Sequence, residues 1–207
     1  MTYQNLYFNR ARRIARLLRI IPYTCAVFLT GSVARGEAGK SSDIDFFIVV
    51  KSGRIWTCRV LVTMIIQIIG KRRYGNNVAG RICLNRYQTE DNLEITPHNA
   101  YHRKDYSQVV PLWDQNNIYD KYKKANKWIG KLKVHKVYKV HKVRNQSSCI
   151  QRFLESILDT KFGDFFEKKQ KKYQKKRITS DPRTKASKQW QIVATDNELS
   201  FHPEKKG

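Results

Sequence analysis

The sequence predicts an α/β fold, a mixed sheet with flanking helices, followed by a basic and mostly helical C-terminal extension. Two apolar runs, residues 25–30 and 43–50, have the length of buried strands and are bounded by Gly, Ser and Lys. Apolar residues recur at helical spacing before and after them. From about residue 120 acids become scarce, and residues 122–154 contain none. These observations divide the chain into an α/β domain over 1–112, a basic helical extension over 113–177 and a loosely ordered tail over 178–207.

The first helix is expected before Pro22. Ile14, Leu17, Leu18 and Ile21 follow the i, i+3, i+4, i+7 spacing of one helical face, and proline ends a helix. The strand over 25–30 then closes at a glycine, and a loop or short helix follows it. The strand over 43–50 is apolar on both faces beyond its aspartates, so we expect it at the centre of a covered sheet.

The next elements are a helix over 55–69, a basic loop over 70–80 and a third strand over 81–88. Loop and helix are expected over 89–113. A helix is expected over 153–177, where apolar residues again recur at helical spacing. The three-residue lysine repeat over 133–143 fits either a helix with a broad basic stripe or low-complexity disorder.

The charge balance favours a polyanionic partner. Lys and Arg number 41 against 17 Asp and Glu, for a formal net charge of +24. Such an excess is typical of proteins that bind nucleic acid, and the alternative is a highly charged solvated surface. RNA or another polyanion is therefore expected on the basic C-terminal region.

Cysteine usage and hydropathy exclude several other classes. The four cysteines form no CxxC pair, and Cys25, Cys58 and Cys83 have apolar neighbours, so we interpret them as buried thiols in a reducing, cytoplasmic setting rather than as a disulfide frame or zinc site. No signal peptide is evident, and no membrane span is expected, because the most apolar run is short and interrupted by Arg59 and Gln67. The sequence contains no Walker A, Rossmann or GxSxG motif.

Two aspartates mark the candidate site. Asp43 and Asp45 stand two apart on a strand, so their side chains share one face about 6.6 Å apart along it. Holding two carboxylates together requires a positive partner, either an arginine or a metal ion. Gly31 directly follows the preceding strand and permits a close backbone approach, while the Ser32 hydroxyl can donate to a phosphate. Oxygen ligands of this kind suit a hard cation such as Mg²⁺.

The stretch "GSVARGEAGKSSDID" resembles the GSx10DxD signature of minimal nucleotidyltransferases, within the DNA polymerase β-like superfamily. The resemblance is strong over residues 28–50 and extends to about residue 112. It implies a polymerase β-like fold, with metal bound by Asp43 and Asp45, the catalytic pair. Nucleotide phosphates would contact the loop residues between the two strands, namely Gly31, Ser32, Arg35 and Ser42.

The chain departs from this family at the third carboxylate. Such enzymes usually carry one on a later strand, and the strand expected here over 81–88 holds no acid. Asn85 is nearest to the expected position, and its carbonyl is a weak metal ligand that cannot act as a base. Carboxylates that could substitute lie elsewhere in the sequence: Glu37, Glu90, Asp91 and Glu94.

The resemblance implies a Mg²⁺-dependent enzyme, with one or two ions, that moves a nucleoside monophosphate from ATP or another NTP to a hydroxyl. The acceptor is left open among RNA, a protein and a small molecule. A second hypothesis is a non-catalytic nucleic-acid-binding protein on the same fold. The missing third acid and the acid-free stretch over 122–154 favour this alternative.

Overall fold

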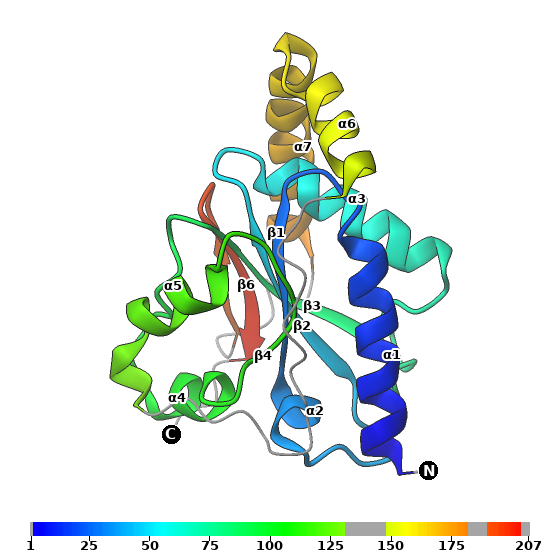
Figure 1. The fold of residues 1–207 in the computed structure, drawn as a ribbon, viewed down its shortest axis with the longest axis vertical. Helices are drawn as coiled ribbons and strands as arrows, with labels where there is room; N and C mark the ends of the chain where they lie inside the picture. Colours follow the sequence, from blue (N-terminus) through cyan, green and yellow to red (C-terminus); the bar gives the residue numbers. More distant parts are fainter. Residues whose placement is uncertain (1, 131–147, 182–189, 204–207) are drawn as a thin grey trace.

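The apolar runs pair side by side in one mixed sheet. The computed structural model describes residues 2–130, 148–181 and 190–203. Within them six strands lie in the order β4-β1-β2-β3-β6-β5 (Figure 1). Only β2 and β3 run parallel, and every other neighbouring pair is antiparallel. The strands are β1 (Thr24–Thr30), β2 (Ile44–Val50), β3 (Ile82–Thr89), β4 (Val110–Asp114), β5 (Trp190–Ala194) and β6 (Glu198–Pro203).

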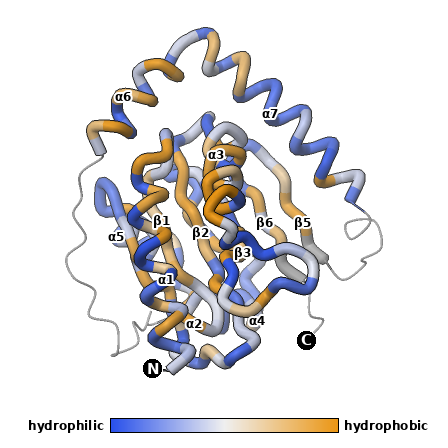
Figure 2. Tube along the Cα trace, turned by 90° about the vertical axis from the view of Figure 1, so that its right-hand side faces the viewer, coloured by the Kyte–Doolittle hydropathy of each residue, from blue (hydrophilic) through white to orange (hydrophobic). Residues whose placement is uncertain are grey.

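Helices cover both faces of the sheet, as the sequence predicts. α1 (Tyr3–Leu18) and α3 (Ile55–Ile68) enclose one core, to which β2 contributes Ile44, Phe46 and Ile48. α4 (Ala100–Tyr106) and α5 (Ile118–Ala125) enclose the other, which holds Phe47 and Val49. Because both faces are covered, β2 is apolar at successive positions rather than alternating with polar residues (Figure 2). The short α2 (Gly31–Arg35) follows β1, and the 3-10 helix η1 (Lys127–Ile129) follows α5.

The helix expected over 153–177 is two helices, which corrects the prediction. α6 (Cys149–Leu158) and α7 (Lys161–Ser180) form a hairpin that projects from the body (Figure 1). The chain turns at Asp159, whose carboxylate accepts a hydrogen bond of 2.9 Å from the Tyr23 hydroxyl. A side chain at Gly163 would overlap the Leu158 carbonyl, so the turn is too tight for any other residue there.

Acids of this hairpin hold it to the body. Glu167 accepts hydrogen bonds from the backbone amides of Trp56 at 3.0 Å and Thr57 at 2.7 Å. These amides lie at the start of α3, where no residue of the helix can satisfy them. α7 therefore caps α3 from more than a hundred residues away.

Part of the tail expected to be loose forms strands, and the segment "LSFHP", which could dock as a short piece, lies within one of them. β5 and β6 extend the sheet, with β6 antiparallel to β3 and β5 antiparallel to β6. Leu199 is fully buried, and Arg86 donates to Glu198 at 2.6 Å in the interior. Only the pairing of β6 with β3, and of β5 with β6, makes these short segments part of the sheet.

Two further differences concern element boundaries. β4 was not expected as a strand, and it spans the boundary predicted at residue 112. The lysine repeat over 133–143 lies outside the described residues. In the described part of the chain, no helix combines the length and apolar character that a membrane crossing needs.

Candidate functional site

The end of β1 and the start of β2 bring the two halves of the motif together. The strands pair antiparallel with Thr30 opposite Asp45, so Gly31 comes to lie against the Asp45 side chain. Gly31 adopts φ +69°, and a Cβ at this position would overlap Asp45 Oδ2. Glycine is therefore required for both the backbone conformation and the close approach.

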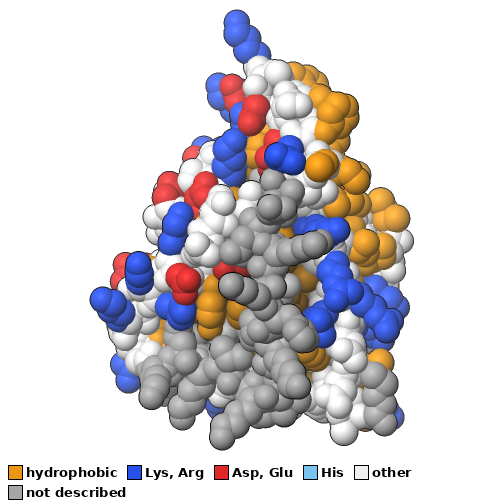
Figure 3. Space-filling model, viewed as in Figure 1, with side chains coloured by type: hydrophobic (Ala, Val, Ile, Leu, Met, Phe, Trp, Pro, Cys, Tyr) orange, Lys and Arg blue, Asp and Glu red, His pale blue; other side chains and the backbone are white. Residues whose placement is uncertain are grey.

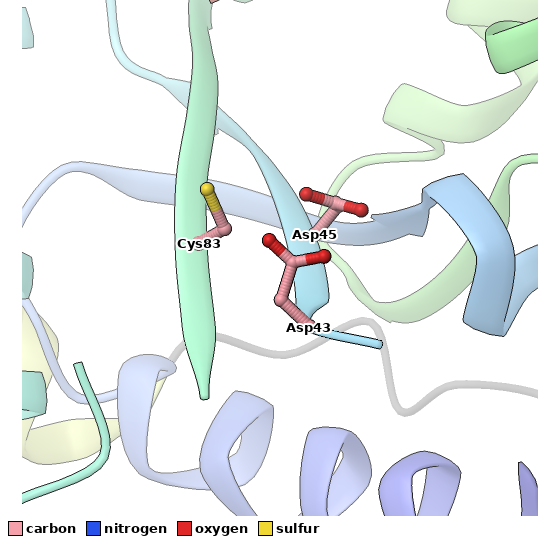
Figure 4. Close-up of side chains that lie close together, drawn as sticks. All are labelled: Asp43, Asp45 and Cys83. Atoms are coloured by element: carbon pink, nitrogen blue, oxygen red, sulfur yellow. The ribbon is translucent and has the colours of Figure 1, made fainter. Parts of the chain in front are cut away.

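Three side chains converge beside this turn. Asp43 and Asp45 point the same way, as their spacing predicts, and Cys83 of β3 lies opposite Asp45 in the parallel ladder (Figure 4). One ligand atom from each of the three lies within 4.8 Å of the other two. Burial raises the pKa of Asp45 to about 8, and the nearby charges of Asp43 and Asp105 add to this effect. Asp45 therefore tends to hold a proton at neutral pH unless a cation lies beside it.

Protein groups offset part of this charge. Arg73, in the basic loop between α3 and β3, donates to Asp43 Oδ2 at 2.6 Å. The amide of Asn85 donates to Asp45 Oδ1. The Arg73 side chain is 43% exposed, so it can swing toward solvent when another cation approaches. The guanidinium thus contacts Asp43 directly and counteracts the rise in the pKa of Asp45 only through its charge.

Cys83 corrects the prediction of a buried thiol without a place in the site. It is half-buried, and its thiol donates to Asn85 Oδ1 at 2.6 Å. Burial raises its pKa to about 12, with further increases from Asp45 and Asp43. Without a metal the thiol is therefore protonated, and a cation bound by all three groups would have to displace that proton. Metal-binding roles for Asp43 and Asp45 stay predictions.

Asn85 lies where the sequence places it, beside Asp45. The ladder between β2 and β3 shifts register after Phe46, so that Phe47 pairs with Arg86 and Asn85 stands without an opposite residue. Such a bulge re-aims the side chains around it. Here it leaves both Asn85 and Arg86 directed toward the α4 side of the sheet, where Asp45 also lies. A metal-binding role for Asn85 stays a prediction.

The structure brings in a carboxylate that the sequence analysis missed. Asp105 of α4 accepts from Arg35 Nη1 at 3.0 Å and is 18% exposed. Burial raises its pKa, which Arg35 partly counteracts, and its charge also raises the pKa of Asp45. No local motif marks Asp105, because its position depends on how α4 packs on the sheet.

The four acids proposed as substitutes have other contacts or positions. Glu37 pairs with Arg35 at 2.8 Å, and Glu94 pairs with His98 at 2.9 Å. Hydrogen bonds from Thr89 and Ser52 lower the pKa of Asp91. Glu90 follows the last residue of β3 and lies at the far end of the sheet from Asp45. Asp45 pairs with Cys83 near the start of β3, whereas Thr89 at its end pairs with Val50.

The remaining loop residues differ in their surroundings. The Ser32 hydroxyl makes no hydrogen bond within the described part of the chain, so it can still donate to a ligand. Arg35 is held by Glu37 and Asp105. Ser42 Oγ accepts from the Gly39 amide at 3.0 Å and closes the turn before β2. Nucleotide-binding roles for these residues stay predictions.

Comparison with known proteins gives one match. A family model described as "Nucleotidyltransferase domain" matches residues 12–181, which include every site residue described above. No curated protein matches the chain, and neither does any solved structure.

Proposed function

The chain belongs to the nucleotidyltransferase domain family, and from this premise we propose that it transfers a nucleoside monophosphate, AMP in the first instance, from an NTP to an acceptor hydroxyl. The observation that carries the proposal is the convergence of Asp43 and Asp45 against the Gly31 turn. In this arrangement the two carboxylates would act as cation ligands beside the Gly31–Ser32 turn, where the phosphates would bind.

The donor set fits a divalent cation with a preference for oxygen. Asp43 and Asp45 offer carboxylate oxygens, whereas a metal bound through Cys83 would first have to displace the thiol proton. One or two Mg²⁺ ions held there would neutralise the aspartates and supply positive charge to the phosphates of the NTP. Arg73, which now neutralises Asp43, would be displaced toward solvent or onto a phosphate.

Residues of the chain itself would perform the other tasks. Gly31 and Ser32 would hold the phosphates, the glycine by close approach and the serine by its hydroxyl. In the reaction the acceptor oxygen bonds to the α-phosphorus, the bond from the α-phosphorus to the oxygen bridging to the β-phosphate breaks, and pyrophosphate leaves. Asp105, whose charge acts on Asp45, is the carboxylate we assign to taking the hydroxyl proton, and its raised pKa suits this role. Asn85 cannot do so.

A non-catalytic nucleic-acid-binding protein is the second candidate. It is favoured by Asn85 at the position where related enzymes are expected to carry an acid, and by the net charge of +24. The two candidates differ in one measurable respect, because only the enzyme transfers label from the α-phosphate of ATP to another molecule.

The test combines binding and transfer. The protein is incubated with α-labelled ATP, Mg²⁺ and either total RNA or lysate, and the label is followed into nucleic acid, protein or small molecules. Asp43→Asn should abolish Mg²⁺-dependent ATP binding, measured by calorimetry, without unfolding the protein, since it also relieves carboxylate repulsion. Asp120→Asn, at an exposed position on α5, is the matched control and should bind as wild type. Unchanged Mg–ATP affinity in Asp43→Asn would refute the proposal.

A further inference from the structure

A groove of about 340 Å³ lies between α1 and the segment that joins α3 to β3. Its floor is aliphatic, formed by Leu6, Ile14 and Leu17 of α1 and by Ile69 at the end of α3. Leu6 and Leu17 are 38% and 46% exposed, so this apolar surface is open to a ligand. The floor therefore offers a surface on which a flat apolar group can lie.

The rim of the groove is basic. Arg10 and Arg13 of α1 line one side and Lys71 lines the other. Arg10 donates to the carbonyl oxygen of Gly80 at 2.6 Å, which fixes its position without neutralising its charge. Figure 3 shows Lys and Arg side chains gathered over α1 next to hydrophobic ones.

Neither wall contains an acid that could neutralise this charge. Residues 1–36 and 46–89 include no Asp or Glu, yet they hold six and eight Lys or Arg. The described residues give no ion pair to Arg10, Arg13 or Lys71. A basic surface without its own acids is the electrostatic counterpart of a phosphate backbone.

One segment of the chain links the groove to the carboxylate pair. Lys71, on the groove, and Arg73 are two residues apart in an extended segment, where Arg72 forms a bridge with Ile82 of β3. Such a segment advances about 6.6 Å over two residues. Arg73 donates to Asp43 Oδ2 at 2.6 Å. The segment that lines the groove therefore also carries the arginine that contacts the proposed site of transfer.

We propose that this groove binds single-stranded nucleic acid and holds it as the acceptor, its phosphates on the basic rim and a base on the aliphatic floor. The inference rests on the proposed function, whose acceptor it names. Small-ligand sites occupy about 300–1,000 Å³, so the groove takes a nucleotide unit rather than a duplex. A protein acceptor would find no acid in these walls with which to pair its own Lys and Arg.

The first experiment measures binding. Labelled single-stranded RNA, DNA of the same sequence and an RNA duplex are titrated with protein at several salt concentrations. Two double variants are compared. The groove pair combines Arg13→Glu with Lys71→Glu, and the α7 pair, its matched control, combines Lys168→Glu with Lys172→Glu. Both change the net charge equally, but the α7 pair lies away from the groove. The double variant in the groove should weaken single-strand binding at least about tenfold. It should also reduce the slope of log affinity against log salt concentration by about two, because each lost phosphate contact lowers that slope by about one. The α7 pair should weaken it less than about threefold.

Equal losses of single-strand affinity in the two pairs would overturn the proposal, since only the net charge of the protein would then matter. Tighter binding of the duplex than of the single strand would overturn it as well.

The second experiment separates this inference from the proposed function. Mg–ATP affinity, measured without nucleic acid, reports on the carboxylate site alone, and labelling of the single strands reports on the acceptor. Label in RNA or DNA that falls with the groove pair supports the inference, and the better substrate of the two identifies the sugar. Label in protein alone would overturn it while leaving the proposed function standing. If the wild-type protein binds no Mg–ATP, but the groove pair loses strand binding and the α7 pair does not, the groove is a strand-binding site and the proposed function is refuted.

Discussion

Replacing Gly31 with alanine tests the contact on which the site is built. Gly31 adopts φ +69°, and an alanine Cβ there would overlap Asp45 Oδ2 and lie 3.0 Å from Asp45 Cγ. The two groups cannot keep their positions together. Since the backbone is held by the pairing of Thr30 with Asp45, we expect the carboxylate to turn away from Asp43.

The cost has two parts. A left-handed conformation costs a residue other than glycine about 1–2 kcal/mol. Moving Asp45 about 30° from its preferred rotamer adds about 0.5–1.5 kcal/mol. Gly53→Ala separates the two, because Gly53 adopts φ +75° and a Cβ there meets no atom within 4 Å. It should show only the first part.

The assay is urea unfolding of both variants, with Mg–ATP affinity measured by calorimetry. Gly53→Ala should lose about 1–2 kcal/mol of unfolding free energy and bind Mg–ATP as wild type. Gly31→Ala should lose about 1.5–3.5 kcal/mol of unfolding free energy and at least about tenfold in Mg–ATP affinity, since tenfold corresponds to about 1.4 kcal/mol. Equal destabilisation by the two variants, with unchanged affinity in Gly31→Ala, would refute the reasoning.

Four further predictions address the charges around the site and the capping of α3. Asn85→Asp should strengthen Mg²⁺ binding and raise the labelling rate, by up to about 10²-fold if the new acid serves as the base; an unchanged rate would count against that position. Because the pKa of Asp45 is raised to about 8, Mg²⁺ affinity should rise about tenfold per pH unit up to that value and then level off, with a proton released near pH 6 and none near pH 9 in calorimetry. Because the folded protein binds the Asp45 proton more tightly than the unfolded chain, whose pKa is 3.8, Asp45 stabilises the metal-free fold fully below pH 3.8. This stabilisation is lost as pH rises toward about 8, and the free energy of unfolding measured against pH would detect the loss. Glu167→Ala should cost about 1–2 kcal/mol in urea unfolding by uncapping the amides of Trp56 and Thr57, and Glu167→Gln should cost less.

Local patterns were enough to predict the central part of the fold. The strands β1, β2 and β3 and the helices α1 and α3 follow from hydrophobic periodicity and from Gly and Pro at their ends, which act over a few residues. The pair Asp43 and Asp45 needs only the two-residue alternation of a strand to share a face. The position of Asn85 was expected from the resemblance to nucleotidyltransferases, which implies an acid on a later strand; the pairing of β3 with β2, which puts Asn85 beside Asp45, comes from the structure.

Contacts between distant segments decided the rest. Arg73 donates to Asp43 from a loop about 30 residues later in the chain, and Asp105, about 60 residues later, raises the pKa of Asp45 through its charge; no local pattern marks either residue. Likewise β6 becomes sheet only by pairing with β3, and β5 only by pairing with β6. The helix expected over 153–177 breaks into α6 and α7 at Asp159, and Asp159 and Glu167 bind the body. Local patterns thus define the central strands and the aspartate pair, whereas packing between distant segments places the residues around that pair and brings the acid-free segments together to form a groove.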